Sequence, residues 1–164
     1  MAETTKKIEF NQEQMKAFED ILARYPEDTT KSALLPALYL AQESFGNITN
    51  EVMEYLAEIL KITPAKVREV FTFYTYYRRP GTGKYRIDLC CTLSCAIRGS
   101  KSLVDHLAEK YNLKPGGTTE DGKFSLMKVE CLAACGKAPA VQINGVYYED
   151  LTPEKLDKIL ANLK

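Results

Sequence analysis

Hydrophobic residues in the first half of the chain recur three or four positions apart, which is the period of an α-helix. The pattern predicts a helix that closes at Pro26, a second over about residues 31–45, a third from Thr49 or Asn50 to Leu60, and a fourth that opens at Thr63-Pro64. The second is apolar nearly all round, so we expect it to be central. In the third helix we expect Val52, Met53, Leu56, Ile59 and Leu60 to face inward. The apolar positions that carry the pattern in the other three are Met15, Phe18, Ile21, Leu22, Tyr25, Leu34, Leu35, Leu38, Tyr39, Ala41, Val67, Val70, Phe71, Phe73, Tyr74 and Tyr77. Four helices joined by short loops predict a small four-helix bundle.

In the second half the period changes to two, which is typical of β-strands. The first strand alternates Tyr85, Ile87 and Leu89 with Arg86, Asp88 and Cys90. A helix follows, with Leu103, Val104, Leu107, Ala108 and Tyr111 on one face. After a loop over 114–122 come a strand from Phe124, strands over 140–143 and 146–148 around the hairpin signal Asn144-Gly145, and a helix from Pro153 with Leu156, Ile159, Leu160 and Leu163 inward. The order β-α-β-β-β-α predicts a mixed sheet covered by helices, and the fold class that we expect is α+β.

A turn-rich stretch over residues 78–83, with two glycines and a proline, separates the two patterns. We therefore expect two domains, a helical one over residues 1–80 and a sheet-containing one over residues 81–164. The second domain holds all five cysteines.

An aromatic run, Phe71, Phe73, Tyr74, Tyr76 and Tyr77, closes the helical half and has two interpretations. Aromatic side chains usually pack in protein cores. We therefore expect core packing first; the alternative is that part of the run is a patch that faces a partner protein, because the run covers more than one face of a helix.

Composition and charge exclude several classes of protein. Lys and Arg balance Asp and Glu at 22 each, so bulk electrostatic binding of nucleic acid or of an anionic membrane is disfavoured. The apolar run over residues 33–41 contains Pro36 and is far shorter than the about 20 residues of a membrane span, so we expect no direct membrane insertion. No apolar run follows the first charged residues, so we expect no secretory signal peptide.

The cysteines form two groups, each at the end of a strand. Cys90, Cys91 and Cys95 close the first strand, and Cys131 and Cys135 close the second. Neighbouring strands would bring the two groups together, and four thiolates at one place bind zinc or an iron–sulfur cluster. An odd number of cysteines without an export signal disfavours a disulfide framework.

The spacing favours a two-iron cluster over the other cysteine sites. Structural zinc sites often have two residues between cysteines, whereas here four separate Cys90 from Cys95 and three separate Cys131 from Cys135. Dithiol exchange needs Cys-x-x-Cys, which no pair provides. A Rieske centre needs two histidines, and the chain has only His106, which we expect to be an exposed or capping side chain. Clustering also disfavours the interpretation that the cysteines are simply small buried hydrophobes.

Five cysteines leave one to spare at a site with four ligands. Successive side chains of a strand point to opposite faces, so only one of the adjacent Cys90 and Cys91 should reach the site, and spacing does not decide which. Ala133, Ala134 and Gly136 are small enough for backbone N–H groups to approach the sulfurs, which tunes a reduction potential. The basic residues nearest to the cysteines in sequence either moderate the charge of a cluster or are solvated; they are Arg86, Arg98, Lys128 and Lys137.

These motifs resemble a known family. Cys90-x4-Cys95, an interval of 35 residues and Cys131-Leu-Ala-Ala-Cys135-Gly-Lys-Ala-Pro139 are similar to the thioredoxin-like [2Fe–2S] ferredoxin subunit of NADH:quinone oxidoreductase, which is respiratory complex I. The helical half, with Thr63-Pro64-Ala65-Lys66-Val67 leading into Val70-Phe71-Thr72-Phe73-Tyr74, is similar to that family's N-terminal helical region. Relatives commonly have Cys-Leu-Gly-Ala-Cys where this chain has Ala133, and alanine tolerates a positive φ poorly.

The resemblance implies a thioredoxin-like fold for residues 81–164 and partner docking for residues 1–80. It implies one [2Fe–2S] cluster held by Cys90, Cys95, Cys131 and Cys135, with Cys91 as the spare and no catalytic residue. It implies a flavoprotein partner that binds FMN and NADH, since this chain has no Gly-x-Gly-x-x-Gly or phosphate-binding loop of its own. We expect a cytoplasmic protein, or one held at the cytoplasmic face of the inner membrane through its complex, with a possible homodimer in isolation.

Three alternatives stay open. The same module occurs in NAD-dependent electron-bifurcating hydrogenases and formate dehydrogenases, and the sequence does not separate these from a respiratory complex. The second alternative is a structural zinc domain that serves as an interaction module. The third is a thiol–disulfide enzyme on a thioredoxin-like fold.

Overall fold

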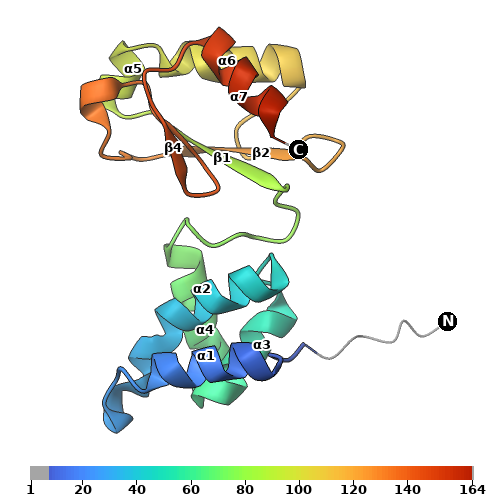
Figure 1. Ribbon diagram of the computed structural model, residues 1–164, viewed down its shortest axis with the longest axis vertical. Helices are drawn as coiled ribbons and strands as arrows, with labels where there is room; N and C mark the ends of the chain where they lie inside the picture. Colours follow the sequence, from blue (N-terminus) through green and yellow to red (C-terminus); the bar gives the residue numbers. More distant parts are fainter. Residues whose placement is uncertain (1–7, 164) are drawn as a thin grey trace, which may run out of the picture. The chain divides into compact units, whose positions relative to one another are not determined.

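The computed structural model describes residues 8–163 and divides into two compact units, one that ends at Pro80 and one that begins at Gly81 (Figure 1). Each unit has its own hydrophobic core. No helix within residues 8–163 is both long enough and apolar enough to cross a membrane.

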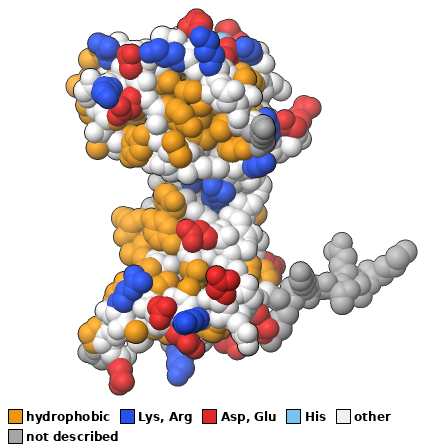
Figure 2. All heavy atoms as spheres, in the orientation of Figure 1, with side chains coloured by type: hydrophobic (Ala, Val, Ile, Leu, Met, Phe, Trp, Pro, Cys, Tyr) orange, Lys and Arg blue, Asp and Glu red, His pale blue; other side chains and the backbone are white. Residues whose placement is uncertain are grey.

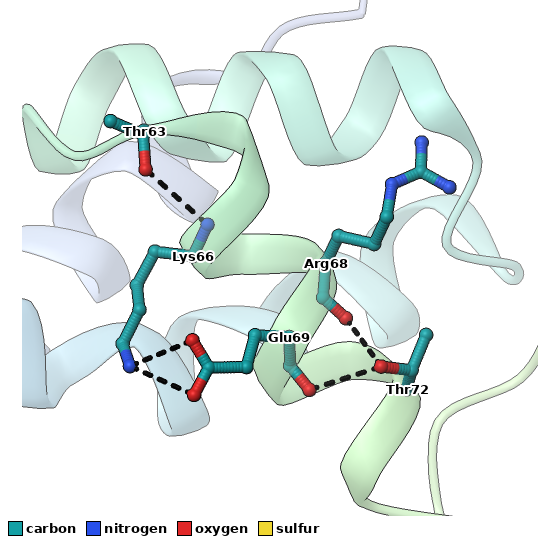
Figure 3. A network of polar contacts seen from close by, with 5 residues as sticks. All are labelled: Thr63, Lys66, Arg68, Glu69 and Thr72. Carbon is teal, nitrogen blue, oxygen red and sulfur yellow. Dashed lines mark hydrogen bonds and ion pairs between the residues drawn. The ribbon is translucent and has the colours of Figure 1, made fainter.

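The first unit contains the four expected α-helices and a short 3-10 helix. Their bounds are α1 Gln12–Leu22, η1 Glu27–Ala33, α2 Leu34–Phe45, α3 Asn50–Leu60 and α4 Pro64–Phe73. The side chains of Asn11, Thr49 and Thr63 cap α1, α3 and α4 by accepting a hydrogen bond from a backbone N–H of the first turn. In α4, Thr63 Oγ1 accepts from the Lys66 N–H, and Lys66 is in turn paired with Glu69 (Figure 3).

Three helix boundaries differ from the sequence prediction. The first helix ends at Leu22, so Tyr25 and the predicted stop at Pro26 lie beyond it. The α-helix expected from residue 31 begins at Leu34, because Thr29 has non-helical angles and the segment before Leu34 is a 3-10 helix. Pro36 then falls in the first turn of α2, where a missing N–H is tolerated. The fourth helix ends at Phe73 and Tyr74 is extended. Tyr77, expected on that helix, is buried beyond its end, where its hydroxyl donates to the Leu35 carbonyl at 3.0 Å.

The core of the helical unit lies around α2, as predicted. Helix α2 packs against α1, α3 and α4, and it buries Leu34, Ala37, Leu38 and Ala41. The N-terminal segment joins this core through Phe10, whose ring stacks on Phe45 and whose backbone N–H donates to the Tyr55 hydroxyl at 3.0 Å.

The aromatic run divides between the two interpretations. Phe71 and Tyr77 belong to the core, whereas Phe73 is 77% exposed and Tyr74 and Tyr76 are also exposed. Tyr39 of α2 is exposed beside them, with its ring 4.8 Å from that of Tyr76. We call Tyr39, Phe73, Tyr74 and Tyr76 the aromatic patch. Hydrophobic side chains reach the surface on the helical unit (Figure 2).

The second unit is a four-stranded mixed sheet with helices, which confirms the predicted sheet type. Its elements are β1 Tyr85–Cys90, α5 Leu93–Ile97, α6 Ser100–Tyr111, β2 Phe124–Val129, η2 Cys135–Lys137, β3 Val141–Ile143, β4 Val146–Tyr148 and α7 Pro153–Asn162. The strand order is β2-β1-β3-β4; β1 is parallel to β2 and antiparallel to β3. Helix α5 is an addition to the predicted order, since five residues are too few to show a helical period.

One face of this sheet is covered by α6 and α7 (Figure 1). Ile87 and Leu89 of β1 and Leu126 of β2 pack there against leucines of both helices; the helix residues are Leu103, Leu107, Leu156 and Leu160. Alternation along β1 sends Arg86, Asp88 and Cys90 to the opposite face. Arg86 is buried and pairs with Asp88 at 2.8 Å, so it is not solvated, whereas Arg98, Lys128 and Lys137 are exposed.

Asp157 of α7 links α7 to α6 through three contacts. Its carboxylate accepts from the Tyr111 hydroxyl at 2.8 Å and pairs with His106 Nε2 at 2.9 Å and Lys110 Nζ at 2.6 Å. Burial raises the pKa of Asp157, but the hydrogen bonds from Lys110, His106 and Tyr111 outweigh it and lower the pKa to about 2. His106 is therefore half-buried by the packing of α7, and the expectation of an exposed or capping side chain was wrong.

Asp157→Asn should destabilise the chain by about 1–2 kcal/mol at neutral pH. A carboxylate with a lowered pKa contributes fully above its unfolded value of 3.8, and the contribution is lost as pH falls toward about 2. The free energy of unfolding from urea titrations should therefore differ between wild type and variant at pH 6 and converge near pH 2. Asp105→Asn is the matched control, because Asp105 forms an exposed pair with Lys101 at 2.6 Å and should cost at most about 0.5 kcal/mol. Equal losses in both variants, or a difference that persists near pH 2, would contradict this account.

Candidate metal centre

The first pair of candidate ligands is Cys90 and Cys95. Cys90 ends β1 on the sheet face opposite Ile87 and Leu89, and Cys95 lies in α5. Both side chains are buried, at 1% and 2% exposure, and they form one cluster with Ala138 and Ala140. The Ala138–Pro139 peptide bond is cis. The fold thus gathers the first strand end, α5 and the segment before β3 around two sulfurs.

The second pair is Cys131 and Cys135, in the loop that follows β2. Both are exposed, and their Sγ atoms are 3.6 Å apart. Two thiolates on one tetrahedral metal at about 2.3 Å are about 3.8 Å apart, so this separation fits a pair that shares one metal. The Ala133 N–H donates to Cys131 Sγ at 3.3 Å.

The two pairs are neighbours. Leu132 and Ala134, which lie between the exposed cysteines, pack against the cluster of Cys90 and Cys95. The thiol of Cys95 also interacts with its neighbours: burial raises its pKa, a hydrogen bond with the Ala140 backbone opposes this, and the proximity of Cys90 and Cys135 raises the pKa further. The structure therefore brings the four candidate ligands to one end of the sheet.

The four sulfurs do not form a single compact metal set. Across residues 8–163, no group of three or more His, Cys, Asp or Glu side chains could hold one metal ion. A [2Fe–2S] cluster takes two cysteines on each of two irons, and two adjacent pairs match this donor set.

Hydrogen bonds favour the thiolate form of Cys90. Burial raises the pKa of Cys90, but the Thr92 hydroxyl and the backbone N–H groups of Thr92 and Leu132 donate to its sulfur and lower the pKa overall. The Thr92 Oγ1 to Cys90 Sγ distance is 3.2 Å. Thr92 is not among the site residues predicted from the sequence; the signal that points to it is a hydroxyl residue between two candidate ligand cysteines in one short segment.

Cys91 lies on the other face of the sheet from Cys90. It packs against the core under α6 and α7, and its Sγ is 3.5 Å from the Leu89 carbonyl, to which it donates. Burial raises the pKa of Cys91, which keeps the thiol protonated. The packing thus separates two adjacent cysteines that spacing alone does not distinguish.

Ala133 adopts a positive φ of 59° in the loop between Cys131 and Cys135. This is the left-handed region, which glycine tolerates and alanine enters at a cost of about 1 kcal/mol. The loop therefore adopts the left-handed conformation although alanine is less suited to it than glycine. In this conformation the Ala133 N–H donates a hydrogen bond to Cys131 Sγ.

Known proteins share both the sequence pattern and this arrangement of strands and helices. The family described as thioredoxin-like [2Fe-2S] ferredoxin matches residues 18–164. The chain belongs to this family. Membership confirms the thioredoxin-like character predicted for the sheet-containing unit and the iron–sulfur class predicted from the cysteines.

Relatives of known name cover almost the full length of the chain. An NADH-quinone oxidoreductase subunit of Rickettsia bellii is 42% identical over 156 residues, which are 94% of this chain and 93% of that protein. Another NADH-quinone oxidoreductase subunit, from Thermus thermophilus, is 40% identical over 89% of this chain and 81% of that protein.

A solved structure shares the fold of most of the chain. An NAD+-reducing [NiFe]-hydrogenase in its air-oxidized state aligns with a TM-score of 0.70 and 23% identity over 78% of this chain. The chain spans about a fifth of that hydrogenase chain, 22% of its length. At this identity the likeness shows the fold alone.

Ala133→Gly should stabilise the loop of the second cysteine pair, because glycine adopts the observed φ without strain. We expect the free energy of unfolding to rise by about 0.5–1 kcal/mol in urea titrations. Ala134→Gly is the control, since Ala134 has a φ of −107° and glycine relieves no strain there. It should lose stability, because it removes a methyl group packed against the cluster of Cys90 and Cys95 and adds unfolded-state entropy. A loss of stability in Ala133→Gly as large as in Ala134→Gly would show that the left-handed conformation is not strained.

Proposed function

We propose that this chain is an electron-transfer subunit of an NADH:quinone oxidoreductase and carries one [2Fe–2S] cluster on Cys90, Cys95, Cys131 and Cys135. The observation that carries the proposal is the pairing of these cysteines at one end of the sheet, with Cys91 on the other face. Relatives named as subunits of NADH-quinone oxidoreductase, about 40% identical over nearly the whole chain, support the assignment to that complex.

A [2Fe–2S] cluster supplies storage of one electron at a time. The residues of this chain would hold it between a buried and an exposed pair of ligands. The buried pair, Cys90 and Cys95, excludes water from one side, while the exposed Cys131 and Cys135 leave the other side open to a partner. Backbone N–H groups that donate to the sulfurs stabilise negative charge there, which sets the reduction potential.

The electron donor in this proposal is the FMN of an NADH-oxidising flavoprotein partner. This chain has no Gly-x-Gly-x-x-Gly, so the nucleotide and the flavin belong to the partner. We assign docking to the helical bundle of residues 1–80 and, within it, to the aromatic patch. A hollow of about 460 Å³ adjoins this patch, lined by Glu69, Val70, Thr72, Phe73 and Tyr74. The complex would hold the chain at the cytoplasmic face of the inner membrane.

A second candidate is the same role in an NAD-linked hydrogenase or formate dehydrogenase. The fold of an NAD+-reducing hydrogenase chain is compatible with it, and the relatives of about 40% identity favour the respiratory complex. The complex that co-purifies with the chain decides between them: NADH:quinone activity supports the first candidate, and hydrogen- or formate-dependent reduction of NAD+ supports the second.

Cys90→Ser should remove most of the visible absorption between about 400 and 600 nm that an iron–sulfur cluster gives, because it deletes a buried ligand sulfur. Cys91→Ser is the matched control, since it changes the neighbouring sulfur on the opposite face and should keep the wild-type spectrum. Spectra of the two purified variants test the ligand assignment. An intact spectrum in Cys90→Ser together with its loss in Cys91→Ser would reverse the assignment, and a colourless wild-type protein with bound zinc would refute the cluster.

Phe73→Ser should weaken binding of the flavoprotein partner about tenfold, because buried aromatic anchors dominate the affinity of an interface. Titration calorimetry or pull-down with the flavoprotein measures this, and the cluster spectrum should not change. Val146→Ser is the matched control, since Val146 is also exposed, at 56%, but lies on β4 of the second unit. Equal affinity of wild type and Phe73→Ser would exclude the aromatic patch from the interface.

A further inference from the structure

Within the described residues 8–163, four threonines occupy the N-cap position of a helix, and the side chain of one of them, Thr92, does not cap its helix. Thr49, Thr63 and Thr152 accept a hydrogen bond from the third backbone N–H of their helices, those of Val52, Lys66 and Lys155. This is the usual role of an N-cap threonine. Thr92 begins α5 with the same extended backbone, with φ of −78° and ψ of 171°, yet its side chain makes no capping bond.

The Thr92 hydroxyl is directed to a ligand sulfur instead. Its Oγ1 lies 3.2 Å from Cys90 Sγ, within hydrogen-bonding distance for oxygen and sulfur. A cysteine that binds a metal has lost its proton, so in the loaded protein only the hydroxyl has a proton to donate. Cys90 is 1% exposed, so water has little access to replace this donor.

We propose that Thr92 is a positioning residue whose hydroxyl, instead of capping α5, donates a hydrogen bond to Cys90 Sγ. This bond orients the sulfur and raises the reduction potential of the centre. This rests on the proposed function, because it requires Cys90 to be a ligand. The bond is charge-assisted, and its strength grows with the negative charge on the sulfur. When one electron is added from an external reductant, no covalent bond changes at Thr92 and its proton stays on Oγ1. The hydroxyl therefore stabilises the reduced state more than the oxidised state.

Thr92→Val tests the proposal in the full-length, cluster-loaded chain, because valine keeps the shape and removes only the hydroxyl. Dye-mediated redox titration followed by EPR should show an equilibrium constant for one-electron reduction about threefold to tenfold smaller than in wild type. At 59 mV for each tenfold, the midpoint potential should fall by about 30 to 60 mV. Thr92→Ser restores a hydroxyl and should return the potential toward the wild-type value.

Thr152→Val is the matched control, since it removes a threonine hydroxyl that does cap a helix, α7. It should lower the free energy of unfolding and leave the midpoint potential unchanged. Thr92→Val should instead lower the midpoint potential and leave the free energy of unfolding unchanged. If Thr92→Val loads no cluster, loss in Thr92→Ala with retention in Thr92→Ser would support the positioning role. Equal potentials in wild type and Thr92→Val, or a potential in Thr92→Ser that matches Thr92→Val, would overturn the proposal. A wild-type chain without a [2Fe–2S] EPR signal would instead refute the proposed function, and this inference with it.

Discussion

Parallel pairing of β1 with β2 is the constraint on which the candidate centre depends. The register places Cys90 opposite Val129, so both strands end at the same edge of the sheet. The segments that follow therefore begin side by side, one leading into α5 with Cys95 and the other carrying Cys131 and Cys135. Alternation along β1 acts with this register, because a shift of one residue would exchange Cys90 for Cys91 and send the ligand sulfur into the core under α6 and α7.

The resulting centre is asymmetric. Cys90 and Cys95 are buried beside two alanines, Ala138 and Ala140. Cys131 and Cys135 are exposed, and Ala133 between them has a left-handed backbone conformation. Burial without donors would disfavour thiolates on the enclosed side. Donors from Thr92 and Leu132 to Cys90 offset that penalty. The exposed side is left free for contact with a partner, as the proposed electron exchange requires.

Local sequence signals predicted much of this fold. Thr63-Pro64 opens α4, and Asn144-Gly145 forms the hairpin turn, with φ of 48° and 89°. Features that depend on tertiary packing were not visible: α5 is too short for a period, and the burial of His106 depends on α7. The choice between Cys90 and Cys91 needed the packing on each face of the sheet. Resemblance to a family, rather than spacing, supplied the predicted ligand set.

The most direct measurement is the iron and acid-labile sulfide content of the anaerobically purified full-length chain, with EPR of the reduced protein. We expect about two irons and two sulfides per chain and a signal from a single unpaired electron after one-electron reduction. One zinc per chain, or iron without sulfide, would contradict the claim that two adjacent cysteine pairs hold a two-iron cluster.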